Sequence, residues 1–175
     1  MQELTTRRLV LEPLVVAHAE AMFELLRDAA LYRYLDDSPP ASAQQLRDRY
    51  ARLEARESPD GRQRWLNWVI RPRDDGAPIG YVQATVLPEH ASWVAYVLGR
   101  AHWGCGYANE ATGRVLEHLA SAYGVERFLA SVEAQNERSL RLLGRLGFRA
   151  ATAQELEAHE LTASERLLVA TARRV

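Results

Sequence analysis

A loop with two glycines, placed directly before a helical pattern, holds the residues of this chain that best suit ligand chemistry. The loop reads Trp103-Gly104-Cys105-Gly106-Tyr107-Ala108, and the helical pattern continues from Asn109 to Leu119. Glycine lets a backbone approach a ligand closely, and the first turn of a helix offers unpaired N–H groups and a partial positive charge. The segment therefore predicts a phosphate-binding loop, although the same pattern is also typical of an ordinary tight turn. A dinucleotide-binding fingerprint would need a third glycine where Asn109 stands, which argues against that class of site.

A second polar segment lies one strand further along the chain. It begins Asn136-Glu137-Arg138-Ser139 and ends Leu146-Gly147-Phe148. Asparagine is a favoured residue at the start of a helix, so Asn136 is expected to cap the helix that follows. A hydroxyl in the first turn, here that of Ser139, can donate a proton to a reacting group or only satisfy the local backbone. Both interpretations of Ser139 stay open at this point.

The composition indicates one soluble domain. The chain has 175 residues, with 22 basic and 23 acidic side chains and a formal net charge of −1. A nucleic-acid-binding surface would require a strong basic excess, so we expect no nucleic-acid partner. The single cysteine, Cys105, excludes an intrachain disulfide and fits a reducing compartment. The sequence begins without a signal peptide and has no apolar run of about 20 residues, which predicts a cytoplasmic protein that does not cross a membrane. The five histidines have no metal-ligand spacing, so no metal site is expected.

Hydrophobic patterns predict a single mixed α/β domain over residues 1–175. The predicted strands cover residues 8–13, 65–70, 79–87, 93–98, 127–132 and 167–172. The predicted helices cover residues 17–27, 42–57, 108–123 and 137–146, whereas the pattern over 150–164 favours neither element. Short turns join three successive strands from 65 to 98, which predicts an antiparallel meander. A strand, a crossover helix and another strand favour a parallel pair between 93–98 and 127–132.

These motifs, in this order, resemble the GNAT acetyltransferase superfamily, and within it most of all the branch of ribosomal-protein N-terminal acetyltransferases. The resemblance covers nearly the whole chain, from Thr6-Arg7-Arg8-Leu9-Val10-Leu11 to Phe148, and residues 93–148 carry most of its specificity. It implies the GNAT fold, an α/β (α+β) architecture in which a mixed, mostly antiparallel central sheet is splayed open between two parallel strands and flanked by helices. It also implies that acetyl-coenzyme A (acetyl-CoA) lies in that opening and donates its acetyl group to a primary amine.

The resemblance also implies which residues bind acetyl-CoA, a co-substrate that needs no metal. The pyrophosphate would lie against the two-glycine loop, and the strand before the loop would pair its backbone with the pantetheine arm. The cofactor-binding residues implied in this way are Val97, Leu98, Trp103, Gly104, Cys105, Gly106, Tyr107, Ala108 and Asn136. Trp103 departs from the glutamine or arginine of many family members, although an aromatic residue is common in this branch.

The catalytic groups depart further from the family pattern. Many members place a tyrosine seven residues after the asparagine as proton donor, and here that position is Leu143. In the branch that this chain resembles, a serine three residues after the asparagine is the proposed replacement, which makes Ser139 the candidate general acid. The strand at 93–98 contains no carboxylate, so the candidate bases are Glu133, Glu89, Asp36 and Asp37. Glu110 belongs to the loop signature and is expected to be structural. Because an α-amine has a reference pKa near 7.7–8.0, a chain of waters could replace a dedicated base.

The acceptor pocket is expected beside the loop that joins the first two helices. Its candidate residues are Tyr34, Asp36, Asp37 and Tyr96. The two aspartates could contact a cationic acceptor, and the alternative is that they form a solvated acidic loop. Side chains alternate along a strand, so the aromatic residues of 93–98 cannot all line one pocket.

The expected function is transfer of an acetyl group from acetyl-CoA to a primary amine by direct transfer in a ternary complex. The amine would belong to a protein N-terminus or to a small molecule. The alternative is a catalytically inactive GNAT-fold protein that binds acyl-CoA, which Leu143 and the missing strand carboxylate favour. Acceptor loops vary freely on such a scaffold, so the sequence predicts neither the acceptor nor the general base. Many relatives are dimers, and a homodimer stays open.

Overall fold

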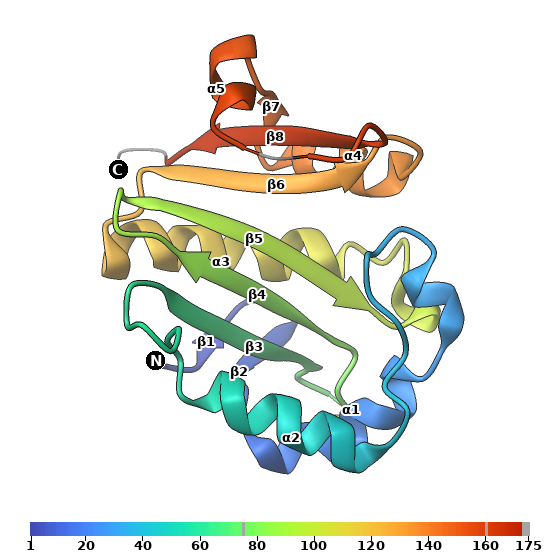
Figure 1. Ribbon diagram of the computed structural model, residues 1–175. Coiled ribbons are helices and arrows are strands. Elements are labelled where there is room, and N and C mark those ends of the chain that lie inside the picture. Colours follow the sequence, from blue (N-terminus) through green and yellow to red (C-terminus); the bar gives the residue numbers. More distant parts are fainter. Residues whose placement is uncertain (75, 160, 173–175) are drawn as a thin grey trace.

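Eight strands form one sheet in the computed structural model, which describes residues 1–74, 76–159 and 161–172 (Figure 1). Along the sheet the strands follow the order β1-β2-β3-β4-β5-β6-β8-β7. Their bounds are β1 Leu4–Thr5, β2 Leu9–Pro13, β3 Arg64–Pro72, β4 Gly80–Val86, β5 Ala91–Leu98, β6 Arg127–Glu133, β7 Arg149–Ala150 and β8 Glu165–Thr171. The helices are α1 Ala19–Leu26, α2 Ala43–Glu54, α3 Tyr107–Tyr123, α4 Glu137–Arg145 and α5 Ala153–Glu157, with 3-10 turns at η1 Val16–His18, η2 Ala29–Tyr32 and η3 Arg100–His102. The described strand pairs are antiparallel except β5 with β6, which confirms the mixed, mostly antiparallel sheet.

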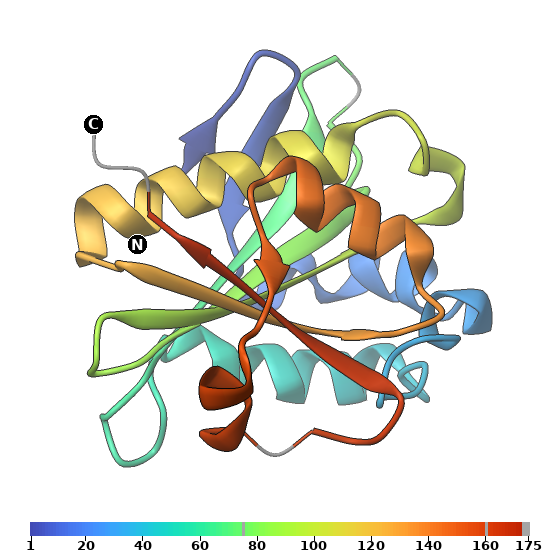
Figure 2. The ribbon, with the colours of Figure 1, turned by 90° about the horizontal axis from the view of Figure 1, so that it is seen from above.

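Helices cover both faces of the sheet. Figure 2 shows α3 and α4 on one side of the sheet and α1 and α2 on the other. Successive side chains of β3 point to opposite faces of the sheet: Trp68 belongs to the core under α3, and Val69 belongs to the core under α1 and α2. Both side chains have no solvent exposure. The sheet therefore separates two hydrophobic cores, one under α3 and one under α1 and α2.

Local sequence sets the bounds of the helices. Ser42 caps α2, because its hydroxyl accepts a hydrogen bond from the Gln45 N–H at 3.1 Å. The helix ends at Glu54, three residues before the predicted end, because Arg56 takes a positive φ of 62°. Gly124 closes α3 with a φ of 65°, as its position after the helical pattern predicts.

Three short elements were not predicted from the sequence: β1, β7 and α5. The two strands have two residues each, and their partners in β2 and β8 define them rather than any pattern of their own. The five-residue helix α5 is held by a capping box between Thr152 and Glu155. Within the described ranges, no helix is both long and apolar enough to cross a membrane.

The parallel pair is the feature that shapes the site. Strands β5 and β6 are paired only where Ala91–Trp93 meets Arg127–Leu129, which confirms the predicted parallel pair. Beyond Trp93 and Leu129 the two strands diverge, as Figure 1 shows. The remainder of β5 therefore has one edge bonded to β4 and one edge that faces the opening.

Candidate active site

The two-glycine loop and the first turn of α3 form a backbone site for an anion. Gly104 and Gly106 have φ values of 79° and 81°, a region that favours glycine. Gly106 is the residue that precedes α3, and among the described residues no side chain caps this helix end. The N–H groups of the first turn have no acceptor within the helix, and the helix dipole adds a partial positive charge. The residues present therefore fit the pyrophosphate of acetyl-CoA.

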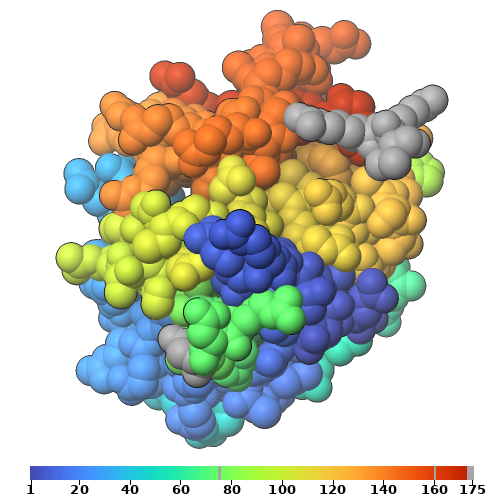
Figure 3. Space-filling model, turned by 180° about the vertical axis from the view of Figure 1, so that it is seen from behind, coloured from blue at the N-terminus to red at the C-terminus, as the bar shows by residue number. Residues whose placement is uncertain are grey.

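The N-terminal hairpin holds this loop in place. The Glu110 carboxylate accepts hydrogen bonds from Thr6 Oγ1 at 2.5 Å, from the Arg8 N–H at 2.9 Å and from Arg8 Nε at 2.7 Å. Arg8 Nη1 also donates to the Cys105 carbonyl at 3.0 Å, and its guanidinium lies 4.5 Å from the centre of the Tyr107 ring. Burial alone would raise the pKa of Glu110, but these hydrogen bonds together hold it below its usual value. Glu110 therefore links α3 to the N-terminal hairpin through hydrogen bonds, and we call this group of residues the Glu110 clamp (Thr6, Arg8 and Glu110). Figure 3 shows the N-terminal segment, in blue, against α3, in yellow.

Trp103 connects the loop to both sides of the opening. Its indole N–H donates to the Leu98 carbonyl at the end of β5, at 2.8 Å. The guanidinium of Arg138, in the first turn of α4, lies 4.3 Å from the centre of the Trp103 ring. A cation held over an aromatic face at this distance is attracted to it. Trp103 is thus part of the scaffold of the loop, and it brings Arg138 close to the predicted phosphate site.

The register of β5 determines which backbone groups face the opening. The Gly99 N–H donates to the Ile79 carbonyl, and the Leu87 N–H donates to the Ala91 carbonyl. Bonded pairs alternate in an antiparallel ladder, so the odd-numbered residues of β5 bond to β4. Tyr96 and Leu98 therefore turn their backbone groups toward the diverging edge, whereas those of Val97 turn toward β4. For pairing with a pantetheine arm this geometry favours Tyr96 and Leu98 over Val97.

Two hydroxyl groups meet at the opening. Tyr96 Oη lies 2.7 Å from Ser139 Oγ, and either oxygen can be the donor. Burial raises the pKa of Tyr96, while the hydrogen bond to Ser139 and the charge of Arg145 partly lower it. The tyrosine therefore stays protonated at neutral pH. Asn136 Oδ1 accepts from the Ser139 N–H at 3.1 Å, which is the predicted helix cap and which fixes the turn that carries Ser139.

The other catalytic positions lie away from this pair. Leu143 is 1% exposed and packs in the core under α3, so this position holds part of the core and no proton donor. Glu133 stands at the end of β6, where its carboxylate accepts a hydrogen bond from Ser164 Oγ at 3.0 Å. This contact ties Glu133 to the segment before β8, and its role as a base stays a prediction.

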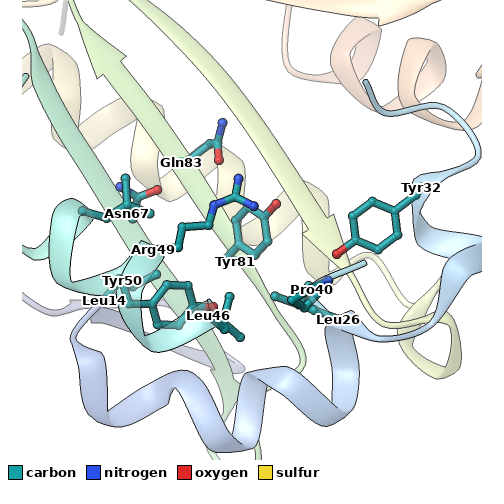
Figure 4. A pocket seen from close by; sticks show the side chains of 11 residues that line it. Leu14, Leu26, Tyr32, Pro40, Leu46, Arg49, Tyr50, Asn67, Tyr81 and Gln83 are labelled. Atoms are coloured by element: carbon teal, nitrogen blue, oxygen red, sulfur yellow. The ribbon is translucent and has the colours of Figure 1, made fainter. Parts of the chain in front are cut away.

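A pocket lies on the opposite face of the sheet, between α1, α2 and strands β3 and β4 (Figure 4). It is lined by Leu14, Leu26, Tyr32, Pro40, Leu46, Arg49, Tyr50, Leu53, Asn67, Tyr81 and Gln83. A larger outer hollow shares Pro40, Leu46 and Arg49 with it and includes Asp36 and Asp37. Asp37 Oδ2 accepts from Arg49 Nη1 at 2.9 Å, and Asp36 is exposed on the rim. Tyr34 lines neither hollow, and Arg33 lies over its ring at 5.2 Å.

The remaining side chains add no metal chemistry. Over the ranges given above, no group of three or more His, Cys, Asp or Glu residues could hold a metal ion. Cys105 is a free, exposed thiol on the loop.

Three arginines of the site were not predicted from the sequence: Arg8, Arg49 and Arg138. The sequence carries a signal for two of them, because Arg8 lies in the segment that opens the family resemblance and Arg138 adjoins Ser139. Arg49 stands among the charged residues of α2, and nothing in that pattern separates it from Arg47 or Arg52. Only the fold shows which of the three faces the sheet.

Comparison with known proteins gives the same fold and the same class of protein. The sequence profile of the acetyltransferase (GNAT) domain matches residues 8–149 of the chain. An uncharacterized N-acetyltransferase of Bacillus licheniformis, p20, is 26% identical over 150 residues, which cover 85% of this chain and 83% of that protein. An uncharacterized N-acetyltransferase of Bacillus subtilis, YoaA, is 29% identical over 147 residues, which cover 83% of this chain and 81% of that protein.

Solved structures show the same arrangement at lower sequence identity. A ribosomal L7/L12 alpha-N-protein acetyltransferase (RimL) in complex with coenzyme A matches with a TM-score of 0.81 and 18% identity, over 97% of this chain and 98% of that one. A ribosomal-protein-S5-alanine acetyltransferase from Vibrio fischeri matches with a TM-score of 0.77 and 17% identity, over 98% and 97% of the two chains. At these identities the likeness establishes a shared fold.

Proposed function

The chain belongs to the GNAT acetyltransferase family, and from this premise we propose that it transfers an acetyl group from acetyl-CoA to a primary amine. The amine is that of a small molecule or of a protein N-terminus, and the transfer is direct, within a ternary complex. The observation that carries the proposal is the pair of hydroxyls, Tyr96 and Ser139, 2.7 Å apart at the opening of the sheet.

The cofactor side of the proposal rests on the uncapped start of α3 and the two left-handed glycines. When bound, acetyl-CoA supplies an activated thioester. The amides of the loop would bind the pyrophosphate, with Arg8 and Arg138 near enough to add positive charge. The outward-facing backbone groups of Tyr96 and the N–H of Leu98, whose carbonyl already accepts from Trp103, would orient the pantetheine arm.

The two hydroxyls provide the proton that the departing sulfur needs. As the C–N bond forms and the C–S bond breaks, Ser139 Oγ would donate its proton to the departing sulfur and recover one from Tyr96 Oη, and the proton lost by the attacking amine would return to Tyr96 through water. Tyr96 is suited to this role because its raised pKa keeps it protonated at neutral pH. A tyrosine from strand β5 thus compensates for Leu143, which lies in the core.

A pair of substitutions tests this assignment. Ser139→Ala should lower kcat by about 10²- to 10⁴-fold, the usual contribution of a positioned proton donor, and Tyr96→Phe by about tenfold, since a water can replace the second hydroxyl. Release of free thiol from acetyl-CoA is measured over a panel of amino acids, polyamines, aminoglycosides and peptides. Calorimetry with coenzyme A should give unchanged affinity for both variants.

Ser131→Ala is the matched control, because its hydroxyl donates to Glu165 on β8, away from the opening. Unchanged turnover in Ser139→Ala would remove that residue from the mechanism. A wild-type protein that binds acetyl-CoA and acetylates no amine of the panel would instead support the alternative, a GNAT-fold acyl-CoA-binding protein.

A further inference from the structure

The pocket on the α2 face combines an apolar lining with an excess of hydrogen-bond donors. Its apolar walls come from leucines of α1, α2 and the segment after β2. Its polar groups include the guanidinium of Arg49 and the phenols of Tyr32, Tyr50 and Tyr81. Burial raises the pKa of all three phenols, that of Tyr81 to about 12, so each remains a protonated donor at neutral pH. The polar end of the pocket is therefore suited to a group that accepts hydrogen bonds.

One of these donors has no partner in the protein. Tyr50 is 3% exposed, and among the described residues its hydroxyl makes no hydrogen bond. A buried hydroxyl without a partner costs about 1–3 kcal/mol of folding free energy. The free space in the pocket is about 20 Å³, room for about one water, so an acceptor atom that removes this cost belongs either to a water or to a small polar group of a ligand that enters from the outer hollow beside Arg49.

Arg49 supplies the charge. A single contact joins Asp37 Oδ2 to Arg49 Nη1, at 2.9 Å, and Asp37 Oδ1 accepts the Ser38 N–H. This contact fixes the guanidinium without using its full set of five N–H donors. In the view of Figure 4 the guanidinium extends across β4 toward Gln83 and Tyr81, which line the same pocket. Asp37 is already engaged, so the cation of this pocket and not its carboxylate is available to a ligand.

A row of cross-strand neighbours connects this pocket with the opening of the sheet. Asn67 pairs with Gln83, and Gln83 pairs with Ala95 on β5. Gln83 and Ala95 are exposed although they lie in the middle of the sheet. Ala95 adjoins Tyr96, whose backbone groups face the opening. Neighbouring strands are about 4.8 Å apart, so the pocket and the reacting edge are separated by roughly 10 Å or less.

From these contacts we infer that the acceptor is a primary amine that also carries a carboxylate, and that Arg49 and Tyr50 bind this carboxylate while the amine reaches the opening past Gln83 and Ala95. The inference rests on the proposed acetyl transfer for the role of the amine, but the carboxylate site can be tested without turnover. Two sources share this chemistry: the carboxylate of a free amino acid, and an acidic side chain close to a peptide N-terminus.

Binding of the acetylated products tests the carboxylate site directly. The probes are N-acetyl-leucine and its uncharged amide, and two N-acetylated peptides that differ only by aspartate or asparagine at the second position. Ligand-observed NMR should show at least about tenfold tighter binding for one of the charged members over its uncharged partner, the range of a charge-assisted hydrogen bond. Preference within the first pair identifies a free amino acid, and preference within the second identifies an acidic N-terminus. Equal binding, or no binding, within both pairs would overturn the inference.

Variants assign the preference to Arg49. Arg49→Gln should remove the tenfold preference and leave the affinity for the uncharged probe within about twofold, and Arg49→Lys should restore part of it, because the charge remains and the forked geometry is lost. Arg47→Gln is the matched control on the same helix, since Arg47 pairs with Glu20 and lines neither hollow. A preference that survives in Arg49→Gln would contradict the assignment.

Turnover separates this inference from the proposed function. If the wild type binds charged products selectively but acetylates neither leucine nor the acidic peptide, acetyl transfer fails and the carboxylate site stands. If it acetylates leucinamide and leucine alike, and Arg49→Gln affects both equally, the transferase stands and the carboxylate site fails. Comparing wild type and variant on the same amine removes differences in basicity between the two amines.

Discussion

The two faces of the sheet carry proposed ligand sites that are built from different groups. On the α3 face the contacts to phosphate come from backbone amides, and the Glu110 clamp satisfies the surrounding side chains by hydrogen bonds of 2.5–2.9 Å. On the α2 face the proposed contacts come from side chains of several elements, among them Arg49 and Tyr50. Backbone contacts depend on chain geometry and a few glycines, whereas side-chain contacts change with every substitution. If both proposals hold, the α3 face provides the common reaction and the α2 face the selectivity.

The largest expected effect is on the α3 face, at Gly106. In Gly106→Val a β-branched residue would have to adopt a φ of 81°, and its Cβ would lie 3.3 Å from Arg8 Nη2. Strain of this kind costs about 1–3 kcal/mol, which together with a displaced loop should weaken coenzyme A binding by about 100-fold or more. Calorimetry measures this loss, while binding of N-acetylated products on the α2 face should persist. Gly144→Ala in α4 is the control, because its added Cβ meets no atom within 4 Å. Equal loss on both faces would contradict the separation that we describe.

A smaller effect is expected when the clamp is weakened. Glu110→Gln keeps the shape of the side chain but removes its charge, so we expect three- to tenfold weaker coenzyme A binding and a stability loss of about 1–2 kcal/mol. The sign of the pH dependence follows from the lowered pKa of Glu110: its stabilising contribution is present above the unfolded pKa and is lost as pH falls through the lower folded value. Urea unfolding of wild type and variant between pH 7 and pH 3 should therefore converge at the acid end.

The control for the clamp is Glu117→Gln in the same helix, since Glu117 is 75% exposed and pairs with Arg114 only at 3.9 Å. It should change neither stability nor affinity. An equal response in the two variants would show that Glu110 acts only as one more surface charge.

The smallest effect concerns the unpaired hydroxyl. Tyr50→Phe should stabilise the free protein by about 1 kcal/mol, a rise in melting temperature of roughly 2–4 °C, because it removes a buried donor without a partner. Thr112→Val is the counterpart on the α3 face, where the Thr112 hydroxyl is also buried and unpaired. Both variants should melt at higher temperature, but only Tyr50→Phe should weaken binding of the charged product. A destabilised Tyr50→Phe would mean that its hydroxyl is satisfied in solution.

The same contrast explains what could be predicted from the sequence. The order of strands and helices and the parallel pair follow from hydrophobic periods and turn residues, because each of these acts within a few neighbours along the chain, and the GNAT fold was implied by the family resemblance of the ordered motifs. The cap formed by Asn136 was predicted for the same reason. Local patterns also placed Ser139 at the start of its helix, but not the contact with Tyr96, since the two residues are 43 positions apart.

The α2 face could not be predicted in this way. Asp37 was considered either a contact for a cationic acceptor or part of a solvated acidic loop; in the fold it accepts a hydrogen bond from Arg49, a contact that no local pattern indicated, and its role toward an acceptor stays a prediction. The pocket takes its residues from α1, η2, α2, β3, β4, the segment after β2 and the loop before α2, and their meeting depends on how α2 packs on β3 and β4. Strand register also determines that the backbone groups of Tyr96, and not those of Val97, face the diverging edge of β5. Register is set by the pairing between strands and not by the residues of β5 alone.

The short parallel pair has a consequence for the mechanics of the molecule. Only three residues of β5 pair with β6. The sheet therefore consists of two parts, β1 to β5 and the group of β6, β8 and β7, that are joined by this short parallel pair. A pantetheine arm that is hydrogen-bonded along the free edge of β5, with the rest of acetyl-CoA bound at α3 and α4, would add a second connection between the two parts of the sheet. Binding of acetyl-CoA would then reduce the relative motion of the two parts of the sheet, and its release would restore that motion.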